Sequence, residues 1–343
     1  MALKRKAQPL LAVSMGDPAG IGPEVILKAA AELRSRRDAP ALLVIGDLRA
    51  MTEAARRLRG VPAPLAWHPG DPLLRGIAVM NAGELSARAL RPGHPSVEGG
   101  AAAYRYVAMG AGMALRGEVD ALVTAPISKE WMNRAGYQFP GHSELLAKIS
   151  RTRLWRMMFT GGQMTLALVT VHIGLAKVSS ALTRKRVFDT IDLLAAHLRD
   201  RLGLAKPRIG VLGFNPHAGE NGMFGDEEIR VIAPAIRRAQ KAGIDAFGPL
   251  APDTAFARPD GHFNFDAAVA MYHDQGLIAL KALEFERAVN VTLGLPFVRT
   301  SPDHGTAFDI AGKGKANPSS MIAAIEYASR AARGRAALAS RAA

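Results

Sequence analysis

Short runs of apolar and β-branched residues alternate along this chain with longer stretches in which apolar residues recur every three to four positions. Runs of about four to eight apolar residues are typical of buried strands, and the longer periodic stretches are typical of amphipathic helices. The predicted strands are Leu11–Ser14, Ala41–Ile45, Val119–Thr124, Met164–Val171, Arg208–Leu212, Ala267–Tyr272 and Val289–Leu293. The clearest predicted helices follow Pro23 to about Arg36, Pro95–Val97 to about Arg116, Thr183 to about Leu202, and Asp226 to about Ala242.

This alternation of strands with helices predicts an α/β fold with a mainly parallel sheet that is covered on both faces. No Pro/Gly-rich linker divides the chain, which favours two lobes that exchange strands over two tethered domains. In open sheets of this kind, ligands bind beyond the carboxyl ends of the strands. The polar residues that follow each predicted strand are therefore the candidates for chemistry.

The composition narrows the function classes. With 343 residues, 49% of them hydrophobic, the chain can bury a large core. It has no cysteine, which excludes a disulfide scaffold, a thiolate zinc site, an iron–sulfur cluster and a cysteine nucleophile. Any metal must be held by His, Asp, Glu or water.

Charge and apolar run length argue against a membrane or nucleic-acid partner. The longest apolar runs fall short of the roughly 18 residues of a membrane span, and the LLAV run near the N-terminus is too short for a signal peptide. We therefore expect a cytoplasmic protein. The net charge is +14, but the basic residues are scattered and lack interleaved aromatic residues, so we expect solvated helix faces and no nucleic-acid binding. A positive field would still help to recruit an anionic substrate.

Three of the nine histidines follow predicted strands: His172, His217 and His273. A single histidine in such a place is more often structural, but three at the same edge of one parallel sheet can meet above it. Three neutral imidazoles leave coordination positions open, as a catalytic metal requires. Metal-bound imidazoles need further hydrogen-bond partners, and Asp274 is a candidate for that role. The sequence predicts a catalytic metal site that forms only on folding.

Two glycine-rich segments are also candidates. The first, GDPAGIGPE (16–24), does not match the G-x-G-x-x-G spacing. It is either a bare turn or a turn that presents the start of a helix to an anion. The second, DHGTAFDIAGKGKANP (303–318), combines small residues with a hydroxyl, acids, an amide and two lysines. That set suits a dinucleotide, and the alternative is a tight surface loop.

The second segment is similar to the nucleotide loop of isocitrate and isopropylmalate dehydrogenases, which bind a dinucleotide without a Rossmann fold. The whole chain resembles the 4-hydroxythreonine-4-phosphate dehydrogenase family. The resemblance rests on GDPAGIGPE (16–24), VTAPISKE (123–130), GHSELLA (141–147), VTVHIGL (169–175), NPHAGENGMFGDEE (215–228), GPLAPDT (248–254), MYHDQGL (271–277), LK (280–281) and VNVTLGLPFVRTSPDHGTAFDIAGKGKA (289–316). These segments lie in the same order over nearly the whole chain.

The resemblance implies a two-lobed α/β/α fold of the isocitrate dehydrogenase-like type, not a Rossmann fold. Residues 1–140 with 290–343 would form a dinucleotide-binding lobe, and 141–289 a metal, substrate and dimerisation lobe, with the active site in the cleft between them. It also implies a homodimer with the active site near its interface. One divalent metal (Zn, Mg, Mn or Co) would be held by His172, His217 and His273.

The resemblance further implies which residues hold substrate and cofactor. The substrate-binding residues are His142, Ser143, Lys281, Asn290 and Arg299. We assign the binding of NAD or NADP to His304, Gly305, Thr306, Asp309, Gly312 and Asn317.

Two departures from the vitamin B6 branch of the family bear on the substrate. Ser143 stands where threonine is common, and GDPAG stands where that branch often has GEPAG. Together with ENGMFGDEE, these features are closer to catabolic relatives. Such relatives oxidise 4-phospho-threonate or phospho-erythronate, or the cis-dihydrodiol of an aromatic carboxylate such as terephthalate. The small anionic substrate stays open among these classes.

The implied reaction is oxidation of a secondary alcohol, followed by decarboxylation when the product is a β-keto acid. The metal would lower the pKa of the substrate hydroxyl, and Lys281 or Asp274 would accept its proton while hydride passes to the nicotinamide. A lysine base needs a lowered pKa. Two other classes remain: a metal-dependent hydrolase or aldolase, which needs no dinucleotide, and a basic nucleic-acid-binding protein, whose affinity would fall steeply with salt.

Overall fold

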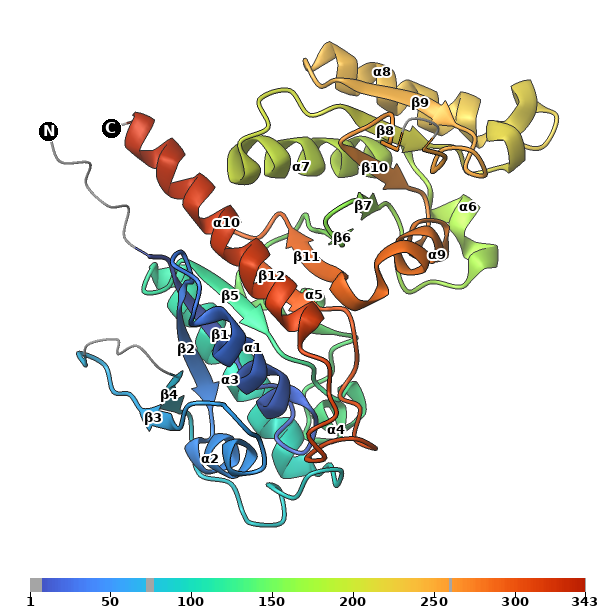
Figure 1. The fold of residues 1–343 in the computed structure, drawn as a ribbon. Helices are drawn as coiled ribbons and strands as arrows, with labels where there is room; N and C mark the ends of the chain where they lie inside the picture. Colours follow the sequence, from blue (N-terminus) through green and yellow to red (C-terminus); the bar gives the residue numbers. More distant parts are fainter. Residues whose placement is uncertain (1–7, 72–76, 259–260, 343) are drawn as a thin grey trace, which may run out of the picture. The chain divides into compact units, whose positions relative to one another are not determined.

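The computed structural model describes residues 8–71, 77–258 and 261–342 of the chain (Figure 1). The chain forms two compact units and passes between them three times. The first unit comprises Met1–Arg153 and Leu295–Arg333, and the second comprises Leu154–Gly294 and Gly334–Ala343. The predicted functions of the two lobes stay predictions.

The first unit contains a parallel sheet with the strand order β3-β4-β2-β1-β5-β12. These strands are β1 (Leu10–Ser14), β2 (Ala41–Gly46), β3 (Pro64–Ala66), β4 (Ile77–Asn81), β5 (Ala121–Thr124) and β12 (Val298–Pro302). Its helices are α1 (Gly22–Leu33), α2 (Leu48–Arg56), α3 (Val97–Arg116), α4 (Lys129–Arg134) and α5 (His142–Ile149), and α10 (Ser319–Ala342) begins there. Strand β1 pairs with β2 on one side and β5 on the other, so the connections change direction between β1 and β5. Ligands bind beyond the strand ends at such a point.

Local sequence explains the boundaries of these elements. The central strands are buried along almost their whole length, as expected for parallel strands covered on both faces. The Ser96 hydroxyl accepts a hydrogen bond from the Gly99 N–H at the start of α3, and Gly117 ends that helix in the left-handed conformation. Within α3, a Cβ on Gly110 would lie 2.7 Å from a Leu122 methyl group, so glycine allows the helix to pack closely on β5.

The second unit contains a sheet with the strand order β11-β6-β7-β10-β8-β9, in which β6 runs antiparallel to both of its neighbours. The strands are β6 (Arg156–Thr160), β7 (Thr165–Leu168), β8 (Ile209–Leu212), β9 (Ala246–Leu250), β10 (Ala267–Ala270) and β11 (Val289–Leu293). The α-helices are α6 (Val178–Ala181), α7 (Arg184–Leu202), α8 (Ala233–Lys241) and α9 (His273–Glu284). Shorter turns of helix are η1 (Leu175–Lys177), η2 (Pro216–Gly222), the π-helical η3 (Glu228–Ile232) and η4 (Phe285–Arg287).

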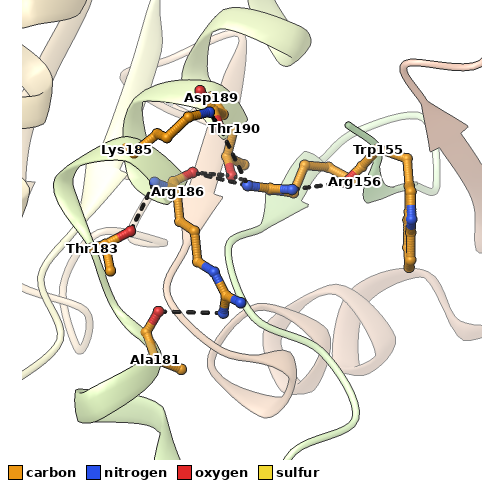
Figure 2. A network of polar contacts seen from close by, with 8 residues as sticks. All are labelled: Trp155, Arg156, Ala181, Thr183, Lys185, Arg186, Asp189 and Thr190. Atoms are coloured by element: carbon orange, nitrogen blue, oxygen red, sulfur yellow. Dashed lines mark hydrogen bonds and ion pairs between the residues drawn. The ribbon is translucent and has the colours of Figure 1, made fainter. Parts of the chain in front are cut away.

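A polar network fixes the start of β6 against α7 (Figure 2). The Arg156 guanidinium donates to the Thr190 hydroxyl at 2.8 Å and to the Arg186 carbonyl at 3.4 Å. It also lies 3.9 Å from Asp189, which is paired with Lys185 at 2.7 Å. Burial lowers the pKa of Arg156, and the Asp189 carboxylate opposes that shift. These contacts explain how a strand can begin with a partly buried cation.

The predicted α/β class and mainly parallel sheet are confirmed, with corrections to element bounds. The strand predicted over Met164–Val171 is only Thr165–Leu168, and the strand predicted over Ala267–Tyr272 ends at Ala270. The helix predicted after Asp226 begins as the π-helical turn η3. Strands β3, β4, β6, β9 and β12 were not predicted, because they are short or include polar and proline residues. Across the described residues, no helix combines the length and apolar character needed to cross a membrane.

Candidate active site

The second unit contains a cavity of about 680 Å³, which we call the histidine pocket. Residues from three segments line it, among them His172, Leu175, Asp253, Phe256, His273 and Ile278. Its volume falls within the range of small-molecule sites. Apolar and acidic side chains thus surround two of the three predicted metal ligands.

Backbone contacts beyond the ends of β7 and β10 position His172 and His273. The Val169 N–H donates to the Ala270 carbonyl, and the Thr170 hydroxyl donates to the Met271 carbonyl at 2.8 Å. His172 then adopts a left-handed conformation with φ of 51°, and His273 is the first residue of α9. The two segments therefore bring both histidines to the same sheet edge, although neither residue directly ends a strand.

The two rings lie near each other, with their centroids 6.0 Å apart. Two rings that share a tetrahedral metal, each with one nitrogen at about 2.0–2.1 Å, have their centres about 5 Å apart, so these rings lie within about 1 Å of that separation. His273 Nδ1 lies 2.6 Å from Asp274 Oδ1, a contact that leaves Nε2 for a ligand and fits the predicted supporting role of Asp274. This pair of rings fits two positions of a metal site.

His217 does not join the pair. Its Nδ1 lies 3.8 Å from Asp253 Oδ2, and both side chains are more than half exposed. Since Asp253 lines the histidine pocket, His217 lies at the border of that pocket. No group of three or more His, Asp or Glu side chains among the described residues is placed to hold a metal ion. The structure therefore assembles two of the predicted ligands and places the third beside them.

The backbone that carries His217 is unusual. Residues 217–221 all have left-handed dihedral angles, and only one of these residues, Gly219, is a glycine. For residues with a Cβ, this conformation costs about 1–2 kcal/mol each and is normally confined to single positions. Surrounding contacts must offset that cost.

The two candidate bases differ in their surroundings. Asp274 is largely exposed and contacts His273. Lys281 follows His273 by about two turns of α9, and its Nζ lies 6.0 Å from the Phe285 ring centroid. Asn290, a predicted substrate residue, is half-buried on β11 opposite Phe159. The identity of the base stays a prediction.

The first unit brings His142 and Arg299 together with the buried Ser143. Arg299 is 2% exposed and donates from Nε and Nη2 to the Thr124 hydroxyl, at 3.2 and 2.7 Å. Burial lowers the pKa of Arg299 to about 9, an effect that Glu144 opposes, so the guanidinium stays charged at neutral pH. Burial, and then the positive charges of Arg299 and Lys129, hold the pKa of His142 well below its usual value. A neutral imidazole thus lies near a buried cation.

His142 also offers an open binding group. Its Nε2 is buried and has no hydrogen-bond partner among the described residues. Buried polar atoms are normally paired, so this nitrogen is suited to contact a bound molecule. The predicted role of His142 in substrate binding fits this arrangement.

The two glycine-rich segments, far apart in sequence, pack together in the first unit. The Ile21 N–H donates to the Thr306 carbonyl at 2.9 Å. The buried Glu24 carboxylate accepts from the Ala316 N–H at 2.8 Å and the Gly314 N–H at 3.2 Å. Lys28 donates to the carbonyls of Gly314 and Ala316 and to the Glu24 carboxylate. We call these contacts of Glu24 and Lys28 with the loop the clamp. The start of α1 therefore holds the predicted dinucleotide loop in place.

Several predicted cofactor residues lie along this clamped loop. His304 Nε2 is buried without a partner among the described residues, while Gly305 and Asp309 are exposed. Gly312 has a φ of 73°, and a Cβ there would lie 2.8 Å from Pro92. Asn317 instead accepts hydrogen bonds from the Ser319 N–H and hydroxyl, and so caps α10. An orphaned buried nitrogen and an exposed small-residue backbone fit a dinucleotide.

One residue that was not among the predicted site residues has notable chemistry. Asp17 follows β1 and is fully buried. One of its carboxylate oxygens accepts from the Ala19 N–H at 3.0 Å, and the other has no partner among the described residues. Burial raises the pKa of Asp17 to about 6, against the opposing effect of that hydrogen bond. The GDPAG motif that contains Asp17 indicated a turn from sequence. The burial of its carboxyl group depends on tertiary packing, so the sequence did not indicate it.

Comparisons with known proteins place this chain among enzymes. A family model described as pyridoxal phosphate biosynthetic protein PdxA matches residues 38–328. A 4-hydroxythreonine-4-phosphate dehydrogenase of Maricaulis maris is 45% identical over 327 residues, which cover 93% of this chain and 96% of that protein. A D-threonate 4-phosphate dehydrogenase of Pectobacterium atrosepticum is 42% identical over 329 residues, covering 93% and 98%.

Solved structures agree with these relationships. A crystal structure of 4-hydroxythreonine-4-phosphate dehydrogenase from Klebsiella pneumoniae matches with a TM-score of 0.84 and 41% identity, covering 96% of this chain and 99% of that one. A terephthalate 1,2-cis-dihydrodiol dehydrogenase from Burkholderia xenovorans matches with a TM-score of 0.68 and 29% identity, covering 94% and 98%. The similarities therefore extend over nearly the full length of each chain.

Proposed function

Since the chain belongs to the PdxA family of pyridoxal phosphate biosynthetic proteins, we propose that it is a dehydrogenase that oxidises a secondary alcohol of a small anionic substrate. Residues of the 304–317 loop would hold NAD or NADP, which would supply the hydride acceptor. The observation that carries this proposal is the clamped 304–317 loop, whose sequence suits a dinucleotide and which Glu24 and Lys28 hold against the start of α1. The two-lobed architecture of the isocitrate dehydrogenase-like type is part of the same proposal.

The proposed substrate is a four-carbon hydroxy acid that carries a 4-phosphate. Relatives at 45% and 42% identity are named for 4-hydroxythreonine-4-phosphate and for D-threonate 4-phosphate, which share this framework. Buried cationic Arg299 with neutral His142 supports an anionic substrate. An aromatic cis-dihydrodiol is the second candidate, because a terephthalate dihydrodiol dehydrogenase shares the fold at 29% identity.

Different residues of the chain have different roles in the proposed reaction. Arg299 binds the phosphate or carboxylate, and His142 donates or accepts a hydrogen bond through its buried Nε2. Asp274 or Lys281 accepts the proton of the substrate hydroxyl. When bound, nicotinamide accepts the hydride, and a divalent cation provides Lewis acidity that lowers the alcohol pKa. Oxidation of a 3-hydroxy acid yields a β-keto acid, which then loses carbon dioxide.

His172 and His273 are the proposed first two metal ligands, and His217 is the third. The 6.0 Å separation of the His172 and His273 rings supports the pair, whereas His217 would complete the site with a second copy of the chain. Exposed apolar side chains on the rim of the histidine pocket support a homodimer, since Leu175 and Ile278 are 67% and 70% exposed. We therefore propose that a second copy covers this rim.

A substrate panel tests the proposed function. The purified chain is assayed with 4-phosphohydroxythreonine, 4-phosphothreonate and an aromatic cis-dihydrodiol, each with NAD or NADP and with Zn²⁺, Mn²⁺, Mg²⁺ or Co²⁺. We expect a rise in near-ultraviolet absorbance from reduced cofactor with one phosphorylated substrate. Cleavage of a substrate without any cofactor reduction would instead indicate a hydrolase or aldolase.

A further inference from the structure

A run of left-handed residues, 217–221, lies at the border of the histidine pocket. His217, Ala218, Glu220 and Asn221 have φ values of 51°, 53°, 40° and 55°. Residues with a Cβ adopt this conformation singly and rarely in runs. Strain of this kind persists where the surrounding structure enforces it, and it gathers at functional sites.

A buried carboxylate enforces the turn. Glu228 is only 3% exposed, and its Oε1 accepts from the backbone N–H groups of Phe214 and Asn215, both at 2.7 Å. Its Oε2 accepts from Asn215 Nδ2 at 2.9 Å. Hydrogen bonds to a charged acceptor are among the stronger ones in proteins. The carboxylate therefore fixes the chain just before the left-handed residues begin.

The turn also closes around Glu228 from its other end. A Cβ on Gly219 would lie 2.8 Å from Glu228 Oε2, and one on Gly213 would lie 3.2 Å from Oε1. Glycines at these positions make room for the carboxylate. The turn and the carboxylate are therefore fitted to each other.

The helix that supplies Glu228 is irregular at that point. Glu228 opens the π-helical turn η3, which precedes α8. Single π-turns are uncommon overall, and those that occur are often found at functional sites. The preceding Glu227 accepts from Asn215 Nδ2 at 2.8 Å and from the Ser179 hydroxyl at 2.5 Å, so it links the same loop to α6.

We propose that Glu228 is a positioning residue, whose buried carboxylate holds the left-handed turn that sets His217 beside Asp253 at the border of the histidine pocket. The turn directs the His217 Nδ1 to within 3.8 Å of Asp253, a residue that lines the pocket. The value of this arrangement for metal binding rests on the proposed function, in which His217 is a ligand.

The test uses the full chain without metal, titrated with Co²⁺, whose visible absorption reports its ligands. The variants are Glu228→Ala, Glu228→Gln and His217→Ala, with Asp226→Asn as the matched control, because that neighbouring acid is exposed and pairs with Arg230. We expect Glu228→Ala to weaken Co²⁺ binding at least about tenfold, as loss of supporting residues does in metal sites. Glu228→Gln, which keeps an acceptor for both N–H groups, should restore part of the affinity. The control should match the wild type.

Amide hydrogen exchange of peptides covering residues 213–225 gives a readout that does not depend on metal. We expect faster exchange in Glu228→Ala, a smaller rise in Glu228→Gln, and no change in Asp226→Asn. The proposal is overturned if both Glu228 variants exchange at the wild-type rate. It is also overturned if the Glu228 variants exchange faster but bind Co²⁺ as tightly as the wild type, while His217→Ala loses Co²⁺ affinity. If His217→Ala binds Co²⁺ like the wild type, the ligand assignment fails, and the exchange data alone decide the role of Glu228. If Glu228→Ala does not fold, Glu228→Gln provides both readouts.

Discussion

Individual residues in this protein acquire their chemistry from burial. Asp17, Arg299 and His142 have ordinary side chains, yet burial is the largest cause of the shifted pKa of each. The direction differs because burial disfavours the charged form of each group. Burial raises the pKa of Asp17, whereas it lowers the pKa of Arg299 and of His142. Asp17 therefore provides a direct test at the residue scale.

Replacing Asp17 by Asn should change how stability depends on pH. The unfolded chain loses the Asp17 proton near pH 4, but burial raises its pKa in the folded chain to about 6. Between these values the folded state binds more protons, so this group's contribution to the free energy of unfolding falls by about 3 kcal/mol as pH rises. Relative to wild type, the variant should be more stable at pH 7 than at pH 4.

Denaturant unfolding of both proteins at several pH values measures this difference. Asp38→Asn is the control, since Asp38 is exposed and its ion pair with Arg333 is long, at 3.7 Å. A difference between Asp17→Asn and wild type that stays constant from pH 4 to 7 would contradict the buried, raised-pKa carboxyl.

Removing a proposed metal ligand should remove metal and activity together. His273→Ala and His217→Ala should each lower metal content and turnover more than about tenfold, because a neutral imidazole ligand is lost. Elemental analysis after dialysis and the cofactor-reduction assay measure the two effects. His68→Ala is the control, because His68 is exposed in the first unit. Metal-dependent turnover that survives in His217→Ala would remove His217 from the ligand set.

At the scale of elements, the main device is the clamp between the start of α1 and the 304–317 loop. Glu24 and Lys28 lie one helical turn apart. The Glu24 carboxylate accepts from the N–H groups of Gly314 and Ala316, and the Lys28 ammonium donates to the carbonyls of the same two residues. This contact bears on the two interpretations of GDPAGIGPE, of which the one that places an anion at the start of α1 stays a prediction. The segment ends in a helix start that anchors another loop, and it is more than a bare turn.

Replacing Glu24 by Gln should loosen the clamp and weaken dinucleotide binding. A buried hydrogen bond to a charged group contributes roughly 1.5–3 kcal/mol, so we expect the Kd for reduced cofactor to rise about tenfold or more. Fluorescence titration with NADH and NADPH measures the Kd without any turnover. Glu32→Gln on the same helix is the matched control, because Glu32 is exposed and its contact with Arg36 is long. Equal Kd values in the two variants would mean that the clamp does not shape the cofactor site.

At the scale of the whole molecule, the exposed apolar rim of the histidine pocket bears on assembly. Ile278→Asp places a charge on a side chain that is 70% exposed in one chain and buried in the proposed dimer. We expect sedimentation equilibrium to show a shift toward monomer, with activity lost in parallel. Leu115→Asp, at a 44% exposed position on α3, should leave assembly unchanged. A dimer that tolerates Ile278→Asp would place the interface elsewhere.

Sequence alone determined much of this protein. Apolar periodicity located the central strands and main helices, because burial on both faces leaves a strong local pattern. Collinear motifs indicated the family and the candidate residues. Absence of cysteine limited any metal site to His, Asp, Glu and water. Each of these conclusions depends on residue type and local order, which are fully written in the chain.

Only the tertiary structure decided how the candidates are held. The contact between Glu24 and Ala316 joins residues 292 positions apart, and no local pattern predicts it. Strands β6 and β12 escaped prediction because Arg156 and Arg299 find buried partners only after folding. The left-handed turn at 217–221 likewise depends on Glu228. Burial, strain and long-range hydrogen bonds arise only when the chain packs. The pKa of Asp17 and the position of His217 depend on them, and so they could not be predicted from the sequence.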